Sequence, residues 1–495
     1  MEMSQNNNIL RIMDKAKIIG YTSKQIALQL GIDEAIVKRE LTELYKNNLI
    51  SRVGRNLWIL KKYEEMTMDS LFVNPESYVH TFQRNFKIQF SNYSEGITFS
   101  KNGTKAIHKW SPYIQGFSAE FVNDMLSKYS LRRGCKVLDP FCGSGTVLVC
   151  SKMRGINSMG VDLMPLMTFM ASVKTNWNLD IQRIKDFLTP FDKIKDSKIE
   201  ISKPFLKETD RQFSPEVLDN LLRIKQFVWN VCEKDTSIGN LLKLALTSIL
   251  VPCSNLKRSP CLGYVKNKKV PNQLPFKLFL EKVNDMLTDL DGVQQYVKAP
   301  GKVWVRKEDA REALYEKGEF DIAITSPPYV NGMDYVINYK IEMAWLELIK
   351  SYEELTKLKE RMVVCDNVSK KLIQSYSPSY SDTWLDDIES RIAKRLQEKE
   401  NYRRRDMHLI VRKYFDDLYP ILSNVYDALK AGGRFLIVIG DSLMAGIYIP
   451  ADLIVAQMGK QIGYSIEDLM IARERRSGQR RDFRLRESIV VLRKG

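Results

Sequence analysis

The stretch "CKVLDPFCGSGTVLVCSKMRGINSMGVDLMP" (135–165) has the order strand, glycine-rich turn, helix, second strand. The apolar run predicts a buried strand that ends at Asp139, and Thr146 is expected to open the helix. Gly143 and Gly145 stand where the chain must turn tightly and let a ligand approach its backbone. Such a turn suits a nucleotide-like cofactor, although neither GxxxxGK[ST] nor GxGxxG is present.

A second acid follows at the end of the next expected strand. Asp162 in "GVDLMP" stands where an acidic side chain can accept hydrogen bonds from ribose hydroxyls. The same residue can cap the following helix. The two roles are compatible, so the pattern predicts a cofactor contact without excluding the cap.

The stretch "FDIAITSPPYVNGMDY" (320–335) predicts a short buried strand that runs into two prolines. Pro327 and Pro328 have no N–H for a ladder, and proline restricts the residue before it. A stiff loop should therefore hold Ser326 and Tyr329 in fixed relation at the carboxyl edge of a strand, where ligands bind in open α/β sheets. The alternative is a turn that merely ends the strand.

Strands alternate with helices along much of the chain, which predicts a mostly parallel, doubly wound sheet. "GKVWVRKEDAREALYEKGEFDIAITSPPY" predicts strand, helix and strand, and "LKAGGRFLIVIGDS" and "RESIVVLRK" predict later strands. Between these parts, residues 183–300 and 351–412 are expected to be helical insertions, the first with a basic loop, "SNLKRSPCLGYVKNKK".

The N-terminal residues resemble a winged helix-turn-helix. Thr22 is a candidate N-cap, Gly31 a helix stop, and "SRVGRNLWIL" a hairpin that turns at Gly54. The resemblance implies that the third helix enters the major groove of DNA. Winged helices also serve as protein-interaction modules, and that alternative stays open.

Composition narrows the class of protein. The 495 residues are 44% hydrophobic and 27% charged, and the formal charge of +16 favours an anionic partner such as nucleic acid. No apolar run reaches about 18 residues, and no signal core precedes the first domain, so no membrane partner is expected. Seven cysteines without a CxxC pair and three scattered histidines predict neither a disulfide framework nor a metal site, which fits a reducing cytoplasm.

The pair DPFCGSGT and TSPPY resembles the amino-methyltransferases of DNA, which methylate N4 of cytosine or N6 of adenine with S-adenosylmethionine. The resemblance implies a Rossmann-like α/β methyltransferase fold with helical insertions, double-stranded DNA as substrate, and a location at the nucleoid in a prokaryotic cytoplasm. It also admits a cognate restriction endonuclease as partner. The implied cofactor-binding residues are Asp139, Pro140, Phe141, Gly143, Gly145, Thr146, Asp162, Asp309 and Tyr113.

The third acid of this set has several candidates. Asp309 in "WVRKEDARE" would read the adenine amino group of the cofactor, with Glu308 as a competitor. A long insertion separates Asp162 from it, whereas in many members of the family the two acids follow closely. Asp180 or Asp186 could therefore take this role instead.

The TSPPY loop explains how an exocyclic amine could be methylated. Its lone pair is delocalised into the ring, so two acceptors that bind both N–H groups help the nitrogen to pyramidalise. Ser326 Oγ and the Pro327 carbonyl are candidates, Pro328 stiffens the loop, and Tyr329 would stack on a base that has left the duplex. Serine at the first position resembles the cytosine-N4 enzymes, and adenine N6 is the alternative target.

Two other functions are alternatives. Cytosine-C5 methylation needs a nucleophilic cysteine, but Cys253 and Cys261 are not followed by glutamine. A DNA-binding regulator with a vestigial methyltransferase core is the second alternative, and the intact acids, glycines and SPPY argue against it.

Basic clusters supply candidate DNA contacts outside the methyl-transfer core. They are Lys38, Arg39, Arg55, Lys257, Arg258, Arg475, Arg476, Arg480 and Arg481, with the lysines of the 266–269 loop. The predicted organisation is a winged-helix-like domain (1–63), a connector (64–105), the cofactor half of the core (106–182), a helical insertion that is a candidate for target recognition (183–300), the TSPPY segment (301–350), a basic helical insertion (351–412) and the C-terminal core strands (413–495).

Overall fold

The computed structural model describes most of the chain. The described residues are 5–16, 21–54, 57–63, 75–114, 116–259, 261–364, 372–373, 376–378, 380, 382–398, 404–476 and 484–495.

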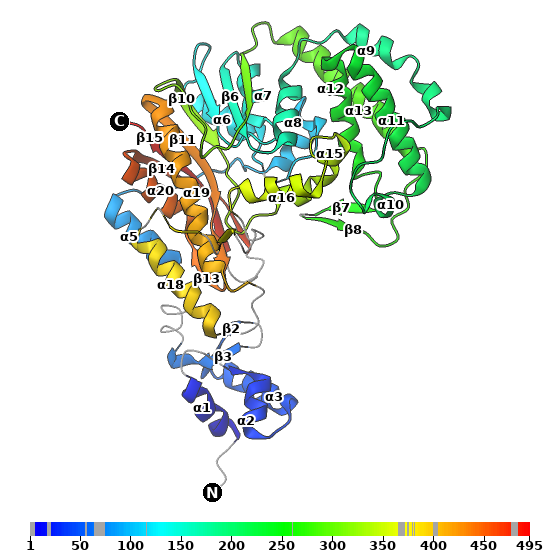
Figure 1. Ribbon diagram of the computed structural model, residues 1–495. Coiled ribbons are helices and arrows are strands. Elements are labelled where there is room, and N and C mark those ends of the chain that lie inside the picture. Colours follow the sequence, from blue (N-terminus) through cyan, green and yellow to red (C-terminus); the bar gives the residue numbers. More distant parts are fainter. Residues whose placement is uncertain are drawn as a thin grey trace.

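A mixed eight-stranded sheet forms the centre of the molecule (Figure 1). Its strand order is β4-β14-β15-β11-β10-β5-β6-β9, and the run from β11 to β9 is parallel, whereas β15 pairs antiparallel with both β11 and β14. This is the Rossmann-like α/β fold that the alternation of strands and helices predicted. The strands are β4 (Phe90–Asn92), β5 (Lys136–Asp139), β6 (Asn157–Asp162), β9 (Val303–Lys307), β10 (Phe320–Thr325), β11 (Leu429–Gly440), β14 (Ser465–Arg476) and β15 (Arg484–Arg493).

The sheet has its topological switch point between β5 and β10. From β5 the chain moves outward through β6 to β9 and then returns to the other side of β5 as β10. In open α/β sheets, ligands bind at the carboxyl ends of the strands at such a point. The glycine-rich turn and the TSPPY loop follow these two strands, so the topology brings the two motifs together.

Both faces of the sheet are covered, as the side-chain alternation along its strands requires. In β11, Phe435 and Ile437 pack with α19 and α20, whereas Leu436 and Val438 pack with α6 and α7. The helices and short 3-10 turns of this body are α5 (Pro75–Phe86), η2 (Phe99–Thr104), η3 (His108–Trp110), α6 (Ala119–Lys128), α7 (Thr146–Met153), α8 (Pro165–Thr175), α14 (Tyr335–Asn338), α15 (Lys340–Trp345), α16 (Tyr352–Arg361), α18 (Thr383–Glu398), α19 (Met407–Ala428) and α20 (Ala451–Ile462). A small hairpin, β12 (Ser442–Met444) with β13 (Ile447–Ile449), follows β11.

The insertion between β6 and β9 forms a helical lobe beside the sheet (Figure 1). Its elements are α9 (Ile181–Leu188), η4 (Phe191–Asp196), α10 (Thr209–Gln212), α11 (Pro215–Lys234), α12 (Thr236–Leu250), β7 (Leu256–Arg258), β8 (Leu262–Tyr264) and α13 (Leu274–Tyr296). The segment expected to be a basic loop is instead the two-stranded β7–β8 hairpin. Backbone pairing between Lys257 and Gly263 explains the difference.

The N-terminal module lies at the lower end of the molecule in Figure 1. It contains α1 (Gln5–Ala16), β1 (Tyr21–Thr22), α2 (Ser23–Leu30), α3 (Glu34–Lys46), β2 (Ile50–Gly54), β3 (Leu57–Leu60) and η1 (Lys61–Tyr63). Thr22 caps α2 through a capping box and Gly31 ends it with a left-handed φ of 65°, as predicted. The strands form an antiparallel sheet of order β1-β3-β2. These elements are compatible with a winged helix, which stays a prediction.

The helix expected between β9 and β10 is absent, and the chain there forms turns. Arg311 provides the reason, because its guanidinium binds the carboxylates of Asp309 and Asp417 instead of leaving the segment free to form a helix.

In the described ranges, no helix combines the length and apolar character needed to cross a membrane. The same residues contain no group of three or more His, Cys, Asp or Glu side chains that could hold a metal ion.

Candidate functional site

The turn after β5 depends on its two glycines. Gly143 and Gly145 have φ of +49° and +84°, a region that side-chain-bearing residues rarely adopt. A Cβ added to Gly143 would lie 2.6 Å from Tyr113 Oη, and one added to Gly145 would lie 3.0 Å from the Cα of Ala171 in α8. The first glycine therefore lets an aromatic ring rest on the turn, and the second lets α8 pack against it.

Asp162 ties the turn to the end of β6. Its Oδ2 accepts a hydrogen bond from the Gly143 N–H at 3.0 Å, and its Oδ1 accepts one from the Met164 N–H at 2.9 Å. Burial raises the pKa of Asp162 to about 6 against the opposing effect of these backbone donors. Each carboxylate oxygen retains a lone pair, so the residue can hold the turn and still accept from a hydroxyl ligand.

A side-chain hydrogen bond joins the two motifs across the switch point. The Thr325 hydroxyl, at the end of β10, donates to Asp139 Oδ1 at 2.7 Å, and the same oxygen accepts from the Phe141 N–H at 3.1 Å. Asp139 is fully buried, and burial raises its pKa to about 7. Because this carboxylate is committed to both loops, its role is to position them.

Tyr113 covers the glycine-rich turn from the segment before α6. Its ring stacks on Tyr339 with centroids 6.2 Å apart and meets Phe99 edge-on at 5.4 Å. Since the ring occupies the space that Gly143 leaves, a ligand on the turn would share that space with an aromatic face. The acceptors of Asp162, the glycine-containing turn and this ring together suit a cofactor that consists of a nucleoside joined to an amino acid.

The TSPPY loop opens into a cleft of about 420 Å³. Tyr113 and Phe117 line it together with Ser326 and Tyr329, so the cleft joins the TSPPY loop to the tyrosine that covers the glycine-rich turn. Arg473 and Arg475 of β14 and Glu487 of β15 complete its wall.

Tyr329 is held more tightly than the sequence indicated. Its hydroxyl donates to Glu487 Oε1 at 2.5 Å and also forms a hydrogen bond with the Ser326 side chain. The Arg475 guanidinium lies over its ring, 5.3 Å from the centroid. A base that stacks on this face must therefore displace Arg475.

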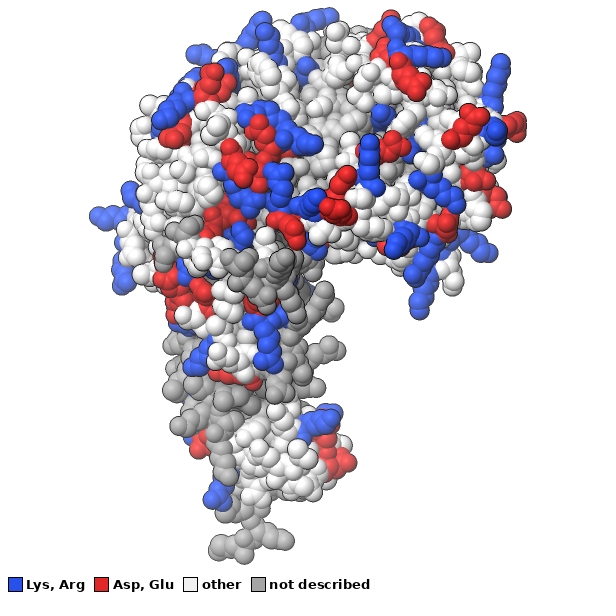
Figure 2. Space-filling model, viewed as in Figure 1, with Lys and Arg blue, Asp and Glu red and all other residues white. Residues whose placement is uncertain are grey.

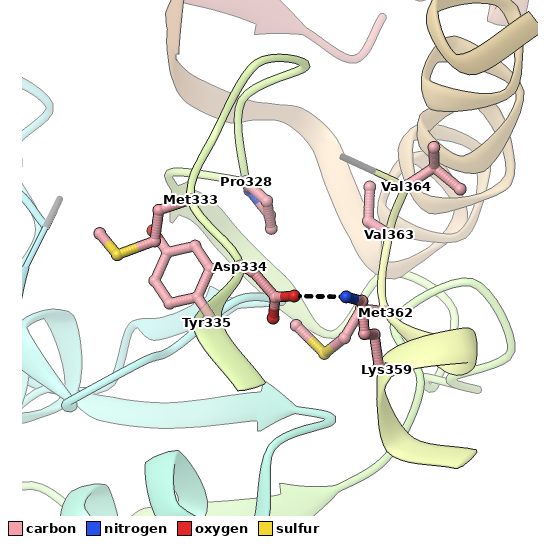
Figure 3. A pocket seen from close by; sticks show the side chains of 8 residues that line it. All are labelled: Pro328, Met333, Asp334, Tyr335, Lys359, Met362, Val363 and Val364. Atoms are coloured by element: carbon pink, nitrogen blue, oxygen red, sulfur yellow. Dashed lines mark ion pairs between the residues drawn. The ribbon is translucent and has the colours of Figure 1, made fainter. Parts of the chain in front are cut away.

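The outer side of the proline pair rests on apolar packing (Figure 3). Pro328 faces a cavity of about 20 Å³, the size of a single water, closed on the other side by Met362 and Val363. An ion pair of 2.7 Å between Lys359 of α16 and Asp334 anchors the chain just beyond the loop. Apolar side chains thus support the loop on the side of Pro328, whereas Ser326 lines the cleft.

Comparison with known proteins finds sequence similarity to type II methyltransferases. The chain is 25% identical over 448 residues to the type II methyltransferase M.BsoBI of Geobacillus stearothermophilus, covering 80% of this chain and 87% of that protein. It is 23% identical over 419 residues to the type II methyltransferase M.AvaI of Nostoc sp., covering 76% of this chain and 82% of the relative.

Over most of its length the chain is thus similar to type II DNA methyltransferases.

A third relative, the type II methyltransferase M.MjaII of Methanocaldococcus jannaschii, is 37% identical over 116 residues, which is 22% of this chain and 21% of that one. No protein-family model matches the chain. Among solved structures, an rRNA methyltransferase from Streptomyces viridochromogenes aligns with 81% of this chain and 94% of its own, at 10% identity and a TM-score of 0.27. The fold assignment therefore rests on the strand order given above.

The predicted third acid stands beside Asp162. Asp309 follows β9, and the neighbouring Glu308 N–H donates to the Asp162 carbonyl at 3.1 Å. The Asp309 carboxylate is bound by Arg311, which lowers its pKa against the effect of burial. Glu308 is bound by Arg306.

The alternative acids lie on the exposed helix α9. Asp180 caps that helix by accepting from the Arg183 N–H, and Asp186 accepts from Gln182. Asp309 lies instead at the carboxyl edge of the sheet, where Arg311 binds its carboxylate. Which of these acids reads the adenine stays a prediction.

Arg258, predicted to contact DNA phosphates, is instead buried in an ion pair. Its side chain is 7% exposed, pairs with Glu342 at 2.7 Å, donates to the Asn338 carbonyl, and lies over the Tyr339 ring, 4.6 Å from the centroid. A buried arginine with a paired carboxylate cannot reach DNA without breaking that pair. The residue instead joins the β7–β8 hairpin to the helices that follow the TSPPY loop.

The other basic candidates divide by exposure. Lys38, Arg39, Lys257, Lys266 and Arg476 are exposed, although Lys38 pairs with Glu34 and Arg39 with Glu40. Figure 2 shows lysine and arginine mixed with acidic side chains over the visible face, with several cations projecting from the lower margin of the helical lobe. Arg475 is half-buried in the cleft, and Arg55, Arg480 and Arg481 lie outside the described residues.

Sequence reasoning missed Glu487 and Arg473. Glu487 is buried in β15, and its Oε2 accepts from Arg473 Nε on the paired strand β14. The available signal was a lone glutamate inside the apolar run "RESIVVLRK", where a charge would be costly without a partner.

Proposed function

We propose that the chain transfers a methyl group to the exocyclic N4 of a cytosine that has been flipped out of double-stranded DNA. One observation carries the proposal: the glycine-rich turn and the TSPPY loop meet at the switch point, joined by Thr325 and Asp139, and the adjoining cleft reaches Tyr113 and Ser326. A cofactor on the turn and an amine at Ser326 would therefore be neighbours.

S-adenosylmethionine is the cofactor that this family and this site call for, and it supplies an activated methyl group. Asp162 would accept from its ribose hydroxyls, the glycine-containing turn from Asp139 to Thr146 would hold the methionine part with Tyr113, and Asp309 would read its adenine. The carboxylate of Asp162, with a free lone pair on each oxygen, fits the first role.

The residues of the TSPPY loop would act by position and electrostatics. Ser326 Oγ and the Pro327 carbonyl would each accept one N–H of the amine, which stabilises the nitrogen as it pyramidalises. The packing behind Pro328 keeps those two acceptors in place. Tyr329 would stack on the base once Arg475 has moved aside.

Recognition of the DNA would come from outside this cleft. The winged-helix-like module with Lys38 and Arg39, the β7–β8 hairpin with Lys257, and the β14–β15 hairpin with Arg476 are the surfaces that we propose for phosphate contacts. A cognate restriction endonuclease would then cut the same sequence when it is unmethylated.

The test is transfer of labelled methyl groups from S-adenosylmethionine to unmethylated DNA, followed by mass spectrometry of the nucleosides. We expect N4-methylcytosine. N6-methyladenine would keep the roles of the loop and change the target base, and the absence of any methylated DNA base with the cofactor bound would overturn the proposal.

A further inference from the structure

We propose that Glu487 receives, through the Tyr329 hydroxyl and the Ser326 hydroxyl, the proton that the target amine loses on methylation. This inference rests on the proposed function, and it gives a role to a buried carboxylate that no motif contains.

Hydrogen bonds connect three side chains of the cleft. The Ser326 side chain is hydrogen-bonded to the Tyr329 hydroxyl, and that hydroxyl donates to Glu487 Oε1 at 2.5 Å. Arg473 Nε donates to the other carboxylate oxygen, so Oε1 is left to the tyrosine. Ser326, Tyr329 and Glu487 therefore form a continuous path from the place of the amine to a carboxylate.

The methyl transfer creates a need for such a path. The nitrogen lone pair forms the new N–C bond, and the S–C bond breaks with its electron pair retained on sulfur. The nitrogen is then positively charged and must release one proton. Ser326 Oγ accepts it and passes its own proton to Tyr329 Oη, and the tyrosine passes its proton to Glu487, which becomes neutral and later returns the proton to solvent.

Arginines of β14 line the cleft beside the Glu487 carboxylate. The charged and titratable groups that face Glu487 are Arg473 and Arg475 of β14 and Tyr329 of the loop. Burial, followed by the charge of Glu487, raises the pKa of Tyr329 well above its usual value, so its proton is present to be passed on. Ser326 alone is a weak base, and the relay gives it an acceptor.

The decisive variants are Glu487→Gln and Tyr329→Phe. Glutamine can still accept from the tyrosine but cannot take up a proton, and phenylalanine keeps the ring and removes the hydroxyl. We expect kcat to fall about 100-fold in each, with the affinities for S-adenosylmethionine and DNA retained. The double variant should lose no more than either single one, because both break the same path.

A pH profile and an NMR measurement separate a relay from a purely structural role. The pH–kcat profile of Glu487→Gln should differ from that of the wild type, because the variant has no carboxylate at this position to take up the proton. In the protein without cofactor or DNA, the tyrosine Cζ resonance that Tyr329→Phe removes should shift in Glu487→Gln. Glu474→Gln is the matched control, since it removes a carboxylate paired with Arg484 at the surface of the same hairpin.

Unchanged kcat in Glu487→Gln would overturn the relay while the methyltransferase proposal stands. Losses that add in the double variant, or a pH profile that Glu487→Gln leaves unaltered, would also overturn it. If wild-type protein transfers no methyl group, the proposed function fails first, and this role fails with it. Cofactor affinity and thermal melting of each variant show whether the fold is intact.

Discussion

The two halves of the site are built differently. The proposed cofactor half is centred on one βαβ unit, where backbone N–H groups and the carboxylates of Asp139 and Asp162 follow β5 and β6. Tyr113 and Asp309 join it from outside that unit. The proposed transfer half, after β10, uses side chains from distant strands, and Tyr329 lies 158 positions from its partner Glu487. The first half is therefore mostly local, whereas the second requires the whole sheet.

This contrast predicts that the halves fail separately. Ser326→Ala should lower kcat/KM by about 1000-fold, because it removes an acceptor for the reacting amine, and Tyr329→Ala should have a similar effect. S-adenosylmethionine affinity, measured by titration calorimetry, should be retained. A matching loss of cofactor affinity would contradict the division into halves.

The converse change is Asp162→Asn. We expect the Kd for S-adenosylmethionine to rise about 10- to 100-fold, since hydrogen bonds to a charged acceptor contribute about 1.5–3 kcal/mol. At saturating cofactor, kcat should be close to that of the wild type. A fall in kcat that excess cofactor cannot restore would place Asp162 in the transfer step.

The pH dependence of cofactor binding follows from the same residue. Asp162 accepts from hydroxyls as a carboxylate, and its pKa is raised to about 6 by burial. Affinity should therefore be present above pH 6 and weaken as pH falls through that value. Asp162→Asn should remove this dependence in calorimetry between pH 5 and 8, and an unchanged slope would assign it to another group.

Thr325→Val tests the connection between the halves. The substitution keeps the shape of the side chain and removes the donor to buried Asp139, which costs about 1 kcal/mol. We expect cofactor affinity and kcat to decrease together, each about fivefold. A decrease in one quantity alone would show that the halves are not coupled through this hydrogen bond, and Thr168→Val in α8 is a suitable control for removal of a threonine hydroxyl.

The smallest effect is expected outside both halves. Lys257→Ala combined with Lys266→Ala should reduce the slope of log affinity for DNA against log salt by about 0.9 for each phosphate that the protein no longer neutralises. Cofactor affinity and kcat at saturating DNA should not change. An unaltered slope would remove the β7–β8 hairpin from the DNA-binding surface.

The sequence predicted the parts of the site that are local. Strand, turn and helix patterns located Gly143, Gly145 and Asp162, and proline chemistry located the TSPPY loop. The partners of Tyr329 depend on the register of β15 between β11 and β14, which no local pattern specifies.

Charged side chains were the hardest to place. Arg258 was predicted to face phosphate but is buried against Glu342, because a basic residue in a basic segment carries no sign of an acid 84 positions away. Arg311 was expected in a helix but binds Asp309 and Asp417. In both cases a tertiary ion pair outweighed the local pattern.

The insertion between β6 and β9 also has a consequence for the order of folding. These strands are parallel neighbours, yet the chain passes through the entire helical lobe between Asp162 and Val303. Closing so long a loop costs entropy unless the loop has already condensed. Because α11 packs on α12 and α12 on α13, the lobe can condense from nearby contacts alone. We expect it to form early and to bring β9 to the sheet as a late step, so that the strand leading to Asp309 docks after the glycine-rich turn has formed.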